Sequence, residues 1–312
     1  MNDSSLSITI VIPAKDPGSV LNDCLKAILQ QRIPSGWSLA VVVVDDGSDI
    51  PVSVKVESTH SVTVSVLRST KNEGRSQAVN RGINLSSSKY VWVIDADCVL
   101  DSEDHFERVV ACFNQGFDFC VGRTIASGDD FWSRYHNEVA IDRTTKNEFI
   151  GYTTACFAAN REKLLKVGGF NSEYRYYGLE DKDLIVTLVA EFGSKSLYSE
   201  PQLTAIHNDQ PTLKSVTRKF NQAGRFSAPI FMGRHKNLYK KLVYSRYDPR
   251  LISPVRQVLL RAIAPFIRSF LPLAPYCLAN RLVPYSIKKL IVQSLCAVAY
   301  FYGGRGLEWP KS

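Results

Sequence analysis

The chain has 312 residues, 45% of them hydrophobic, which is enough for one large domain or a domain with a smaller appendage and excludes a disordered protein. Its net charge of +8 conceals an asymmetry, because residues 1–213 carry 20 basic and 28 acidic side chains whereas residues 214–312 carry 18 basic and two acidic ones. Seven scattered cysteines without a CxxC pair argue against a disulfide framework and favour a reducing compartment.

The first hundred residues alternate short apolar runs with amphipathic ones. The run SLAVVVVDD is almost continuous in valine, as expected of a strand that is buried on both faces. Strands that alternate with helices predict βαβ units and a mostly parallel sheet flanked by helices, an α/β fold. The elements predicted here are strands at 7–13, 38–46, 62–68 and 89–97 and helices at 19–31 and 74–86.

From residue 118 onward the pattern is mixed. We expect a strand in DFCVGRTIA. The stretch TTACFAANREKLLKVGGF predicts a strand followed by a helix that ends at Gly168–Gly169. A helix at 180–193 and a strand region that ends in TAIH come next. The last 77 residues contain two apolar runs, of which Pro265 and Pro272 break the first. Neither run supplies the ~20 uninterrupted apolar residues that a membrane span needs.

Acidic residues stand where the predicted parallel strands end. Asp16 follows the first strand, Asp45 and Asp46 end the second, and Asp95 and Asp97 end the strand at 89–97. Because α/β sheets bind ligands at the carboxyl ends of their strands, we expect these acids to gather at one edge. Residues i and i+2 of a strand face the same side, so the DxD pair would clamp one Mg²⁺ or Mn²⁺ ion. The alternative is a turn with solvated acids.

Other stretches hold candidate site residues, each with an ordinary structural alternative. The DDGS stretch at 45–48 is a tight turn or a nucleotide contact. Gly74 and Arg75 would let the chain approach and bind a ligand, or they belong to a plain loop and surface helix. The acids at 180–181 either cap the following helix or supply a general base. His207 is either a structural histidine or a ligand.

The order of these motifs along the chain carries more information than each motif alone. Pro-x-x-Asp after the first strand is followed by DDGS, NEGRSQAVNRG, DAD, KVGGF before an ED pair, and a downstream histidine. Over roughly residues 7–235 this order resembles the family-2 nucleotide-sugar glycosyltransferases. The resemblance implies a GT-A catalytic domain at 1–235, with a nucleotide-binding half at about 1–100 and an acceptor half at about 101–235. Residues 236–312 would then form a basic, amphipathic helical C-terminal extension.

The resemblance also implies a role for each matching residue. Pro13, Ala14 and Asp16 would line the nucleoside pocket, Asp45, with Asp46 beside it, would accept a hydrogen bond from the nucleobase, and Arg75 would contact the nucleotide. Asp95 and Ala96 would lie near the ribose and metal, Asp97 would bind the metal most directly, and His207 would approach the metal or the diphosphate. Asp181 would be the general base, and Glu180 would position the acceptor. These roles predict inversion by a single displacement, in which Mn²⁺ or Mg²⁺ stabilises the leaving diphosphate and a carboxylate deprotonates the acceptor hydroxyl.

Two departures from the family pattern bear on the substrate. Position 16 is Asp where many relatives carry Asn, which puts the nucleoside contacts in question. Residues 212–235 contain no QxxRW-like stretch, so we predict a non-processive, hexosyltransferase-like enzyme in cell-surface polysaccharide or glycolipid assembly.

The expected partners are a nucleotide-diphosphate sugar, with a UDP-sugar favoured, and a saccharide or lipid-linked acceptor. Trp132 and Tyr135 would either stack on a sugar or pack in the protein.

The basic C-terminal region spaces Arg256, Arg261 and Arg268 among apolar residues. Amphipathic helices on an anionic membrane have this pattern, and the alternative is helices that pack on the protein with solvated arginines. We therefore predict a cytoplasmic protein that is peripheral on the inner face of the cell membrane. The region contains no recognised nucleic-acid motif, so we expect no nucleic-acid partner.

Other functions fit the sequence less well. A sugar nucleotidyltransferase would need an early Gly-rich loop with Arg and Lys, and a dehydrogenase would need GxGxxG after the first strand; neither occurs. The alternative that stays open is a catalytically inactive nucleotide-sugar-binding protein at a membrane surface, which a turnover assay would distinguish.

Overall fold

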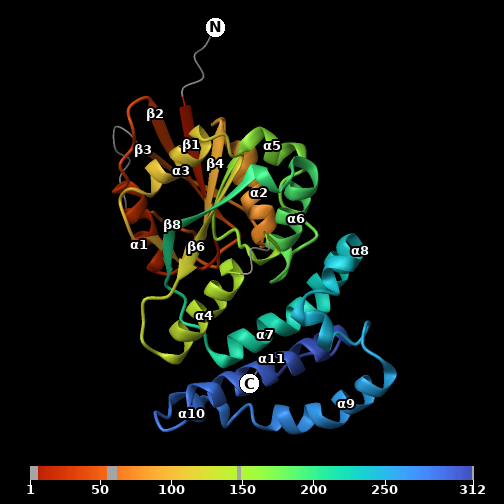
Figure 1. The fold of residues 1–312 in the computed structure, drawn as a ribbon. Coiled ribbons are helices and arrows are strands. Elements are labelled where there is room, and N and C mark those ends of the chain that lie inside the picture. The colour runs from red at the N-terminus through yellow and green to blue at the C-terminus, as the bar shows by residue number, and fades with distance from the viewer. Residues whose placement is uncertain (1–5, 55–61, 146–148, 311–312) are drawn as a thin grey trace. The chain divides into compact units, whose positions relative to one another are not determined.

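The computed structural model describes residues 6–54, 62–145 and 149–310 (Figure 1). The chain divides into two compact units: unit 1, with residues 1–128, 136–175 and 181–209, and unit 2, with residues 129–135, 176–180 and 210–312. The domain boundaries expected at residues 100 and 235 stay predictions.

Unit 1 is built on one mixed sheet of eight strands in the order β3-β2-β1-β4-β7-β6-β8-β5. Its first four strands are parallel to one another, as predicted, and β8 is parallel to β6. The other pairs are antiparallel, because β7 runs against both β4 and β6, and β5 runs against β8. The strands are β1 (Leu6–Ala14), β2 (Trp37–Asp45), β3 (Val62–Arg68), β4 (Tyr90–Ile94), β5 (Cys98–Leu100), β6 (Phe119–Ile125), β7 (Cys156–Asn160) and β8 (Leu197–His207).

Helices cover both faces of this sheet (Figure 1). Strand β1 shows why its sequence is almost continuously apolar: Ile10 packs into a core with α1 and α3, whereas Val11 packs into the opposite core with α2, α5 and α6. The helices that pack on the sheet are α1 (Val20–Leu29), α2 (Arg75–Leu85), α3 (His105–Asn114), α5 (Arg161–Lys166) and α6 (Glu180–Phe192). Helix α4 (Phe131–Thr145) has its first five residues in unit 2, and short 3₁₀ turns lie at Phe149–Gly151 and Ser194–Ser196.

Unit 2 is helical. Its longest element, α11, packs against α7, against the π-helical turn that follows α7, and against α9, and two glycines make the first two approaches possible. A Cβ at Gly303 would lie 2.1 Å from the carbonyl oxygen of Asn221, and one at Gly224 would lie 2.4 Å from that of Tyr300. The helices are α7 (Leu213–Gln222), a π-helical turn (Ala223–Ser227), α8 (Ala228–Tyr239), a 3₁₀ turn (Val243–Tyr247), α9 (Pro254–Ser269), α10 (Ala274–Ala279) and α11 (Tyr285–Gly304).

Two expectations about unit 2 are settled by these helices. Pro265 does not break the apolar run, because it lies inside α9, and only Pro272 falls between helices. Trp132 and Tyr135 pack against the core of unit 2 that Leu213 and Leu295 form, which is the packing alternative. Within the described ranges, every helix is too short or too polar to cross a membrane.

Candidate functional site

The DAD stretch forms a turn between β4 and β5 instead of the end of a strand. β4 stops at Ile94, and the backbone N–H of Cys98 closes the turn onto the carbonyl oxygen of Asp95 at 2.9 Å. The expectation that Asp95 and Asp97 lie on one face of a strand is therefore wrong. The turn directs the two carboxylates to different partners, Arg75 for Asp95 and His207 for Asp97.

Arg75, at the start of α2, is the centre of the first group of site residues. Its Nε donates to Asp95 Oδ1 at 2.8 Å, and the same guanidinium reaches Asp181 Oδ1 at 3.4 Å. It also lies over the ring of Phe170, 5.6 Å from the ring centroid. Burial raises the pKa of Asp95, although the neighbouring charge of Arg75 acts in the opposite direction. The pair is thus an ion pair in a partly dry environment.

Thr154 fixes Asp181 against this arginine. The Thr154 side chain is fully buried; its hydroxyl donates to Asp181 Oδ1 and accepts from Arg75 at 3.1 Å, and its carbonyl oxygen accepts from the same guanidinium. In the described part of the chain these contacts engage only one oxygen of Asp181, whose side chain is 25% exposed. The other oxygen has no hydrogen-bond partner there, so it is available to a ligand.

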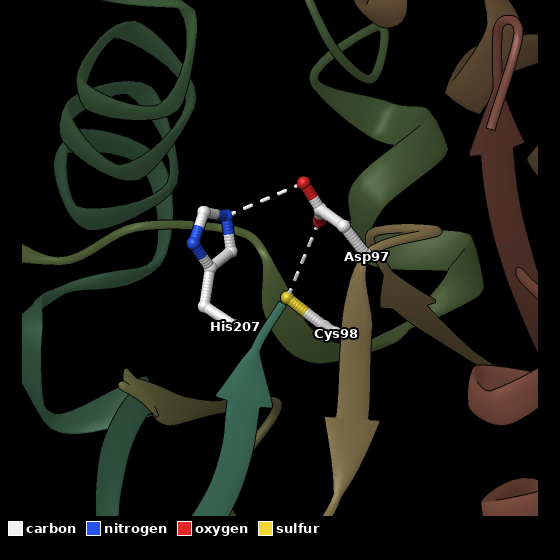
Figure 2. A group of neighbouring side chains, drawn as sticks. All are labelled: Asp97, Cys98 and His207. Carbon is white, nitrogen blue, oxygen red and sulfur yellow. Dashed lines mark hydrogen bonds and ion pairs between the residues drawn. The ribbon is translucent and has the colours of Figure 1, made fainter. Parts of the chain in front are cut away.

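Asp97 and His207 form the second group, which Figure 2 shows with Cys98. His207 is the last residue of β8, and its Nε2 lies 3.4 Å from Asp97 Oδ2. The His207 ring stacks on that of His136, with centroids 5.2 Å apart and planes 14° from parallel. His136 in turn is placed by a contact of its Nε2 with the carbonyl oxygen of Thr124 at 3.2 Å. Stacking and strand pairing together hold the His207 ring toward Asp97.

The Asp97–His207 pair fits a divalent cation. Adjacent ligands at ~2.1 Å from one ion lie about 3 Å apart, close to the observed separation of carboxylate oxygen and imidazole nitrogen. Cys98 is a poor third ligand for Mg²⁺ or Mn²⁺, because its thiol is buried and these hard ions prefer oxygen. Burial also raises the pKa of the Cys98 thiol well above its usual value, which disfavours the thiolate that metal binding needs. Two protein ligands leave positions for phosphate oxygens and water.

A third group joins the ends of β1 and β2. Asp45 is completely buried: its oxygens accept from the backbone N–H groups of Ser48 and Val52 and from Arg68 at 2.8 Å. Burial by itself would raise the pKa of Asp45, but these hydrogen bonds and the Arg68 charge lower it. The Asp45 carboxylate therefore already holds the β2 turn, and its role as acceptor from a nucleotide base stays a prediction.

Asp46 follows β2 and is buried, whereas Asp16 follows β1 and is partly exposed. Asp46 Oδ1 accepts from the N–H of Glu73 at 2.8 Å and Oδ2 from that of Gly74 at 2.9 Å, which ties the β2 end to the loop before α2. Asp16 has a φ of +46°, a left-handed conformation that Asn and Asp tolerate better than most residues. Its Oδ1 accepts from the N–H of Asp49 at 2.8 Å. The acids thus gather at adjacent strand ends, as predicted.

Gly74 is required by the protein chain itself. Its φ of +94° suits glycine, and a Cβ there would lie 2.9 Å from the Cα of Arg175. The expected approach of a ligand to this glycine stays a prediction, whereas its approach to the backbone of Arg175 is a feature of unit 1.

The remaining predicted site residues are placed as follows. Pro13 and Ala14 are the last two residues of β1, and Ala96 lies in the turn between the two acids of DAD. Glu180 opens α6, directly after Leu179, which adopts a φ of +72° although it is not glycine. A left-handed leucine is unusual and costs free energy, so the local backbone is constrained just before the ED pair.

Besides Arg68, sequence reasoning missed three further residues that contact the predicted ones. Thr154 lies at the start of a segment whose pattern predicts only a strand. Phe170 is the last residue of KVGGF, and the pattern gives this phenylalanine no role of its own. His136 lies in α4, one residue after Tyr135, and the sequence around it gives no specific signal. Thr154 lies just before β7, Phe170 lies in the loop after α5, and His136 lies in α4. Their proximity to the acids depends on the antiparallel half of the sheet.

Comparison with known proteins identifies the family and the fold of the chain. Residues 9–171, slightly more than half of the chain, match the family model described as Glycosyl transferase family 2. Dolichyl-phosphate beta-glucosyltransferase of Dictyostelium discoideum is 28% identical over 114 residues, which cover 34% of this chain and 35% of that protein. The 4,4'-diaponeurosporenoate glycosyltransferase of Staphylococcus aureus is 26% identical over 112 residues, which cover 35% and 29%. The match thus spans about a third of the length of these curated relatives.

Solved structures extend the likeness over almost the whole chain. A mannosyltransferase from Pyrobaculum calidifontis, solved in complex with GDP-Man and Mn²⁺, superposes with a TM-score of 0.59 at 17% identity and covers 94% of this chain and 85% of its own. TarS from S. aureus in complex with UDP superposes with a TM-score of 0.53 at 12% identity and covers 96% and 90%. At these identities the likeness concerns the fold, and it confirms the predicted GT-A architecture of sheet and flanking helices.

Proposed function

Because the chain belongs to glycosyl transferase family 2, we propose that it is an enzyme that transfers a sugar from a nucleotide-diphosphate donor to an acceptor hydroxyl. The observation that carries this proposal is the junction of two groups at the β4–β5 turn. Arg75 joins Asp95 to Asp181 on one side of the turn, and Asp97 faces His207 on the other. A candidate base and a candidate cation-binding pair thus stand within one part of unit 1.

The donor nucleotide is proposed to lie against the ends of β1 and β2. Asp16 and the turn that Asp45 holds line this edge, where parallel α/β sheets bind their ligands. The side chain of Asp16 is 46% exposed, so it is accessible to a ribose or base. The donor is a UDP- or GDP-sugar on the precedent of the two solved neighbours, with a UDP-sugar as the first choice to test.

The leaving diphosphate is proposed to sit at Asp97 and His207. When bound there, Mn²⁺ or Mg²⁺ supplies Lewis-acid stabilisation of the negative charge that develops on the diphosphate. The protein contributes the carboxylate oxygen and the imidazole nitrogen, and the stacked His136 keeps the imidazole oriented. The solved mannosyltransferase with Mn²⁺ supports a divalent cation in this fold.

Asp181 is proposed as the general base, with Glu180 positioning the acceptor. Thr154 and Arg75 hold one oxygen of Asp181, which leaves the other to take the proton of the attacking hydroxyl. Attack from the face opposite the leaving group inverts the anomeric centre. The proposed product is a single added sugar on a saccharide or lipid-linked acceptor, in cell-surface polysaccharide or glycolipid assembly, as in the glycolipid-directed names of the curated relatives.

Calorimetric titration tests donor binding first. UDP, GDP, dTDP and CMP are titrated with and without Mn²⁺ into wild type and Asp97→Ala, and one nucleotide is expected to bind only with the metal and only to wild type. Nuclear magnetic resonance of the turnover product then reads its anomeric configuration. Metal-dependent binding without any turnover would favour the inactive binding protein, and retained configuration would contradict the single displacement.

A further inference from the structure

Helix α9 in unit 2 is apolar on two opposite faces. Its inner face is packed: Ala264 is 1% exposed and Ile267 contacts the same core as Val298 and Ala299 of α11. A surface helix ordinarily places polar residues opposite such a face. In α9 the opposite face is instead apolar.

The outward face carries large hydrophobic side chains in helical register. Val255, Val258, Leu259, Ala262 and Phe266 follow at i, i+3, i+4, i+7 and i+11, so they share one side of the helix. Val255 is 78% exposed and Phe266 is 72% exposed. The exposed apolar surface continues along the chain past the end of α9 with Phe270, Leu273 and Tyr276. We call Val255, Val258, Leu259, Ala262 and Phe266 the outward α9 face.

Positive charge borders this face. In the helical projection Arg256 lies on one side of the outward α9 face and Arg261 on the other, and both are exposed. Arg268 is also exposed but lies nearer the packed side of α9, with its guanidinium over the ring of Tyr302 in α11. Residues 214–312 contain only two acids, of which Asp248 is buried against Arg250 and Glu308 lies 3.7 Å from Arg225. Neither acid therefore offsets the charge of the arginines beside the outward α9 face, and the segment keeps a net charge of +16. Arg268 and Lys214 also line a cavity of about 770 Å³ beside α9.

We propose that the outward α9 face docks on the anionic surface of a lipid bilayer, with α9 lying in the plane of the interface. Its apolar side chains enter the boundary between headgroups and acyl chains, and the bordering arginines contact anionic headgroups. A second copy of this chain is a poorer partner, because it would bring two strongly positive surfaces together. The docking surface rests on unit 2 alone, independently of the proposed reaction, and it would favour a lipid-linked acceptor over a soluble saccharide.

Co-sedimentation of the full chain with vesicles tests the proposal. One set of vesicles is pure phosphatidylcholine, and the other contains about one third phosphatidylglycerol. The test variant combines Val258→Ser, Leu259→Ser and Phe266→Ser, and its control is Ile50→Ser, which removes an 81% exposed apolar side chain from unit 1. We expect wild type and the control to bind the anionic vesicles and the triple variant to bind at least ~10-fold more weakly.

A second comparison, between two double variants, separates the effect of where positive charge lies from the effect of the total net charge. Arg256→Gln with Arg261→Gln is compared with Lys26→Gln and Lys166→Gln, two exposed lysines of unit 1, so both proteins lose the same net charge. Only the first pair is expected to weaken binding, by ~10-fold. Circular dichroism and thermal unfolding confirm that each variant is folded. Equal binding of anionic vesicles by the triple variant and wild type, or no binding by wild type, would overturn the proposal. Loss of self-association in the triple variant without loss of vesicle binding would also overturn it, in favour of a second copy.

Discussion

Asp95 and Asp181 both accept from the guanidinium of Arg75, at 2.8 and 3.4 Å, although they come from the β4–β5 turn and from α6. The single positive charge of the arginine therefore reduces the repulsion between two carboxylates in a half-buried place, although it offsets only one of their two negative charges. Its planar fork also fixes their relative orientation, which a single ammonium charge cannot do.

Replacement of Arg75 should separate charge from geometry. We expect Arg75→Ala to lower kcat/KM for the proposed transfer by about 100-fold or more, because Asp181 and Asp95 lose their common partner. Arg75→Lys should recover only a small part of this loss. The measurement is steady-state release of nucleoside diphosphate, and Arg32→Ala, which removes an exposed ion pair with Glu107, is the control. Full activity in Arg75→Lys would show that the fork geometry has no role.

Thr154 should act through Asp181 as a positioning residue. Thr154→Val keeps the shape of the side chain and removes the hydroxyl that donates to Asp181 and accepts from Arg75. We expect kcat to fall by about 10- to 100-fold with little change in nucleotide affinity. Thr154→Ser retains the hydroxyl and should restore most of the rate. Equal losses in the Val and Ser variants would mean that packing, and not the hydrogen bond, is what matters.

The Asp97, Cys98 and His207 group should bind Mn²⁺ through two of its three members. Asp97→Asn and His207→Gln are each expected to weaken Mn²⁺ binding in the presence of nucleoside diphosphate by at least ~10-fold. Cys98→Ala should leave the affinity within about twofold, because a buried sulfur is a poor ligand for a hard ion. Titration followed by electron paramagnetic resonance of free Mn²⁺ measures the affinity, and a large loss in Cys98→Ala would place sulfur in the coordination shell.

Much of unit 1 was predictable from its sequence. The β1, β2 and α2 segments carry apolar runs and turn residues whose periodicity leaves little choice, and the strand predicted at 62–68 coincides with β3. Acids after successive parallel strands must lie at one edge, so the proximity of Asp16 and Asp46 follows from the topology. The family resemblance added the order of the motifs and, with it, the roles to test.

The rest of the site depends on contacts between distant segments, which local patterns do not encode. In the sequence the DAD turn looks like a strand end, because Asp95 continues an apolar run. In the structure its N–H still bonds to the carbonyl oxygen of Ala155 beside β7, and the chain then turns with the bond from the Cys98 N–H to the Asp95 carbonyl oxygen. Thr154 and His136 gave no signal, since a threonine before a strand and a histidine in a helix are ordinary. The sequence predicts amphipathic helices in residues 236–312, but which apolar residues of α9 stay exposed is decided by packing against α11.

Gly74 should be more sensitive to substitution than a glycine with a similar φ in open space. Gly74 and Gly116 have φ values of +94° and +89°, but a Cβ at Gly74 meets the backbone of Arg175 at 2.9 Å, whereas one at Gly116 meets nothing within 4 Å. Gly116→Ala should therefore cost only the left-handed conformation, about 1 kcal/mol in the free energy of unfolding. Gly74→Ala should cost about 2 kcal/mol more, because neither backbone segment can move far.

The two alanine variants should differ in activity as well as in stability. The N–H of Gly74 donates to Asp46 and precedes Arg75, so a shift of this loop moves the guanidinium away from Asp95 and Asp181. We expect Gly74→Ala to lose activity under conditions in which it is still folded, and Gly116→Ala to keep it. Urea unfolding gives the two free energies, and nucleoside diphosphate release gives the rates. Equal destabilisation in both variants would mean that the loop adapts to the added methyl group, and the close approach to Arg175 would then not constrain the site.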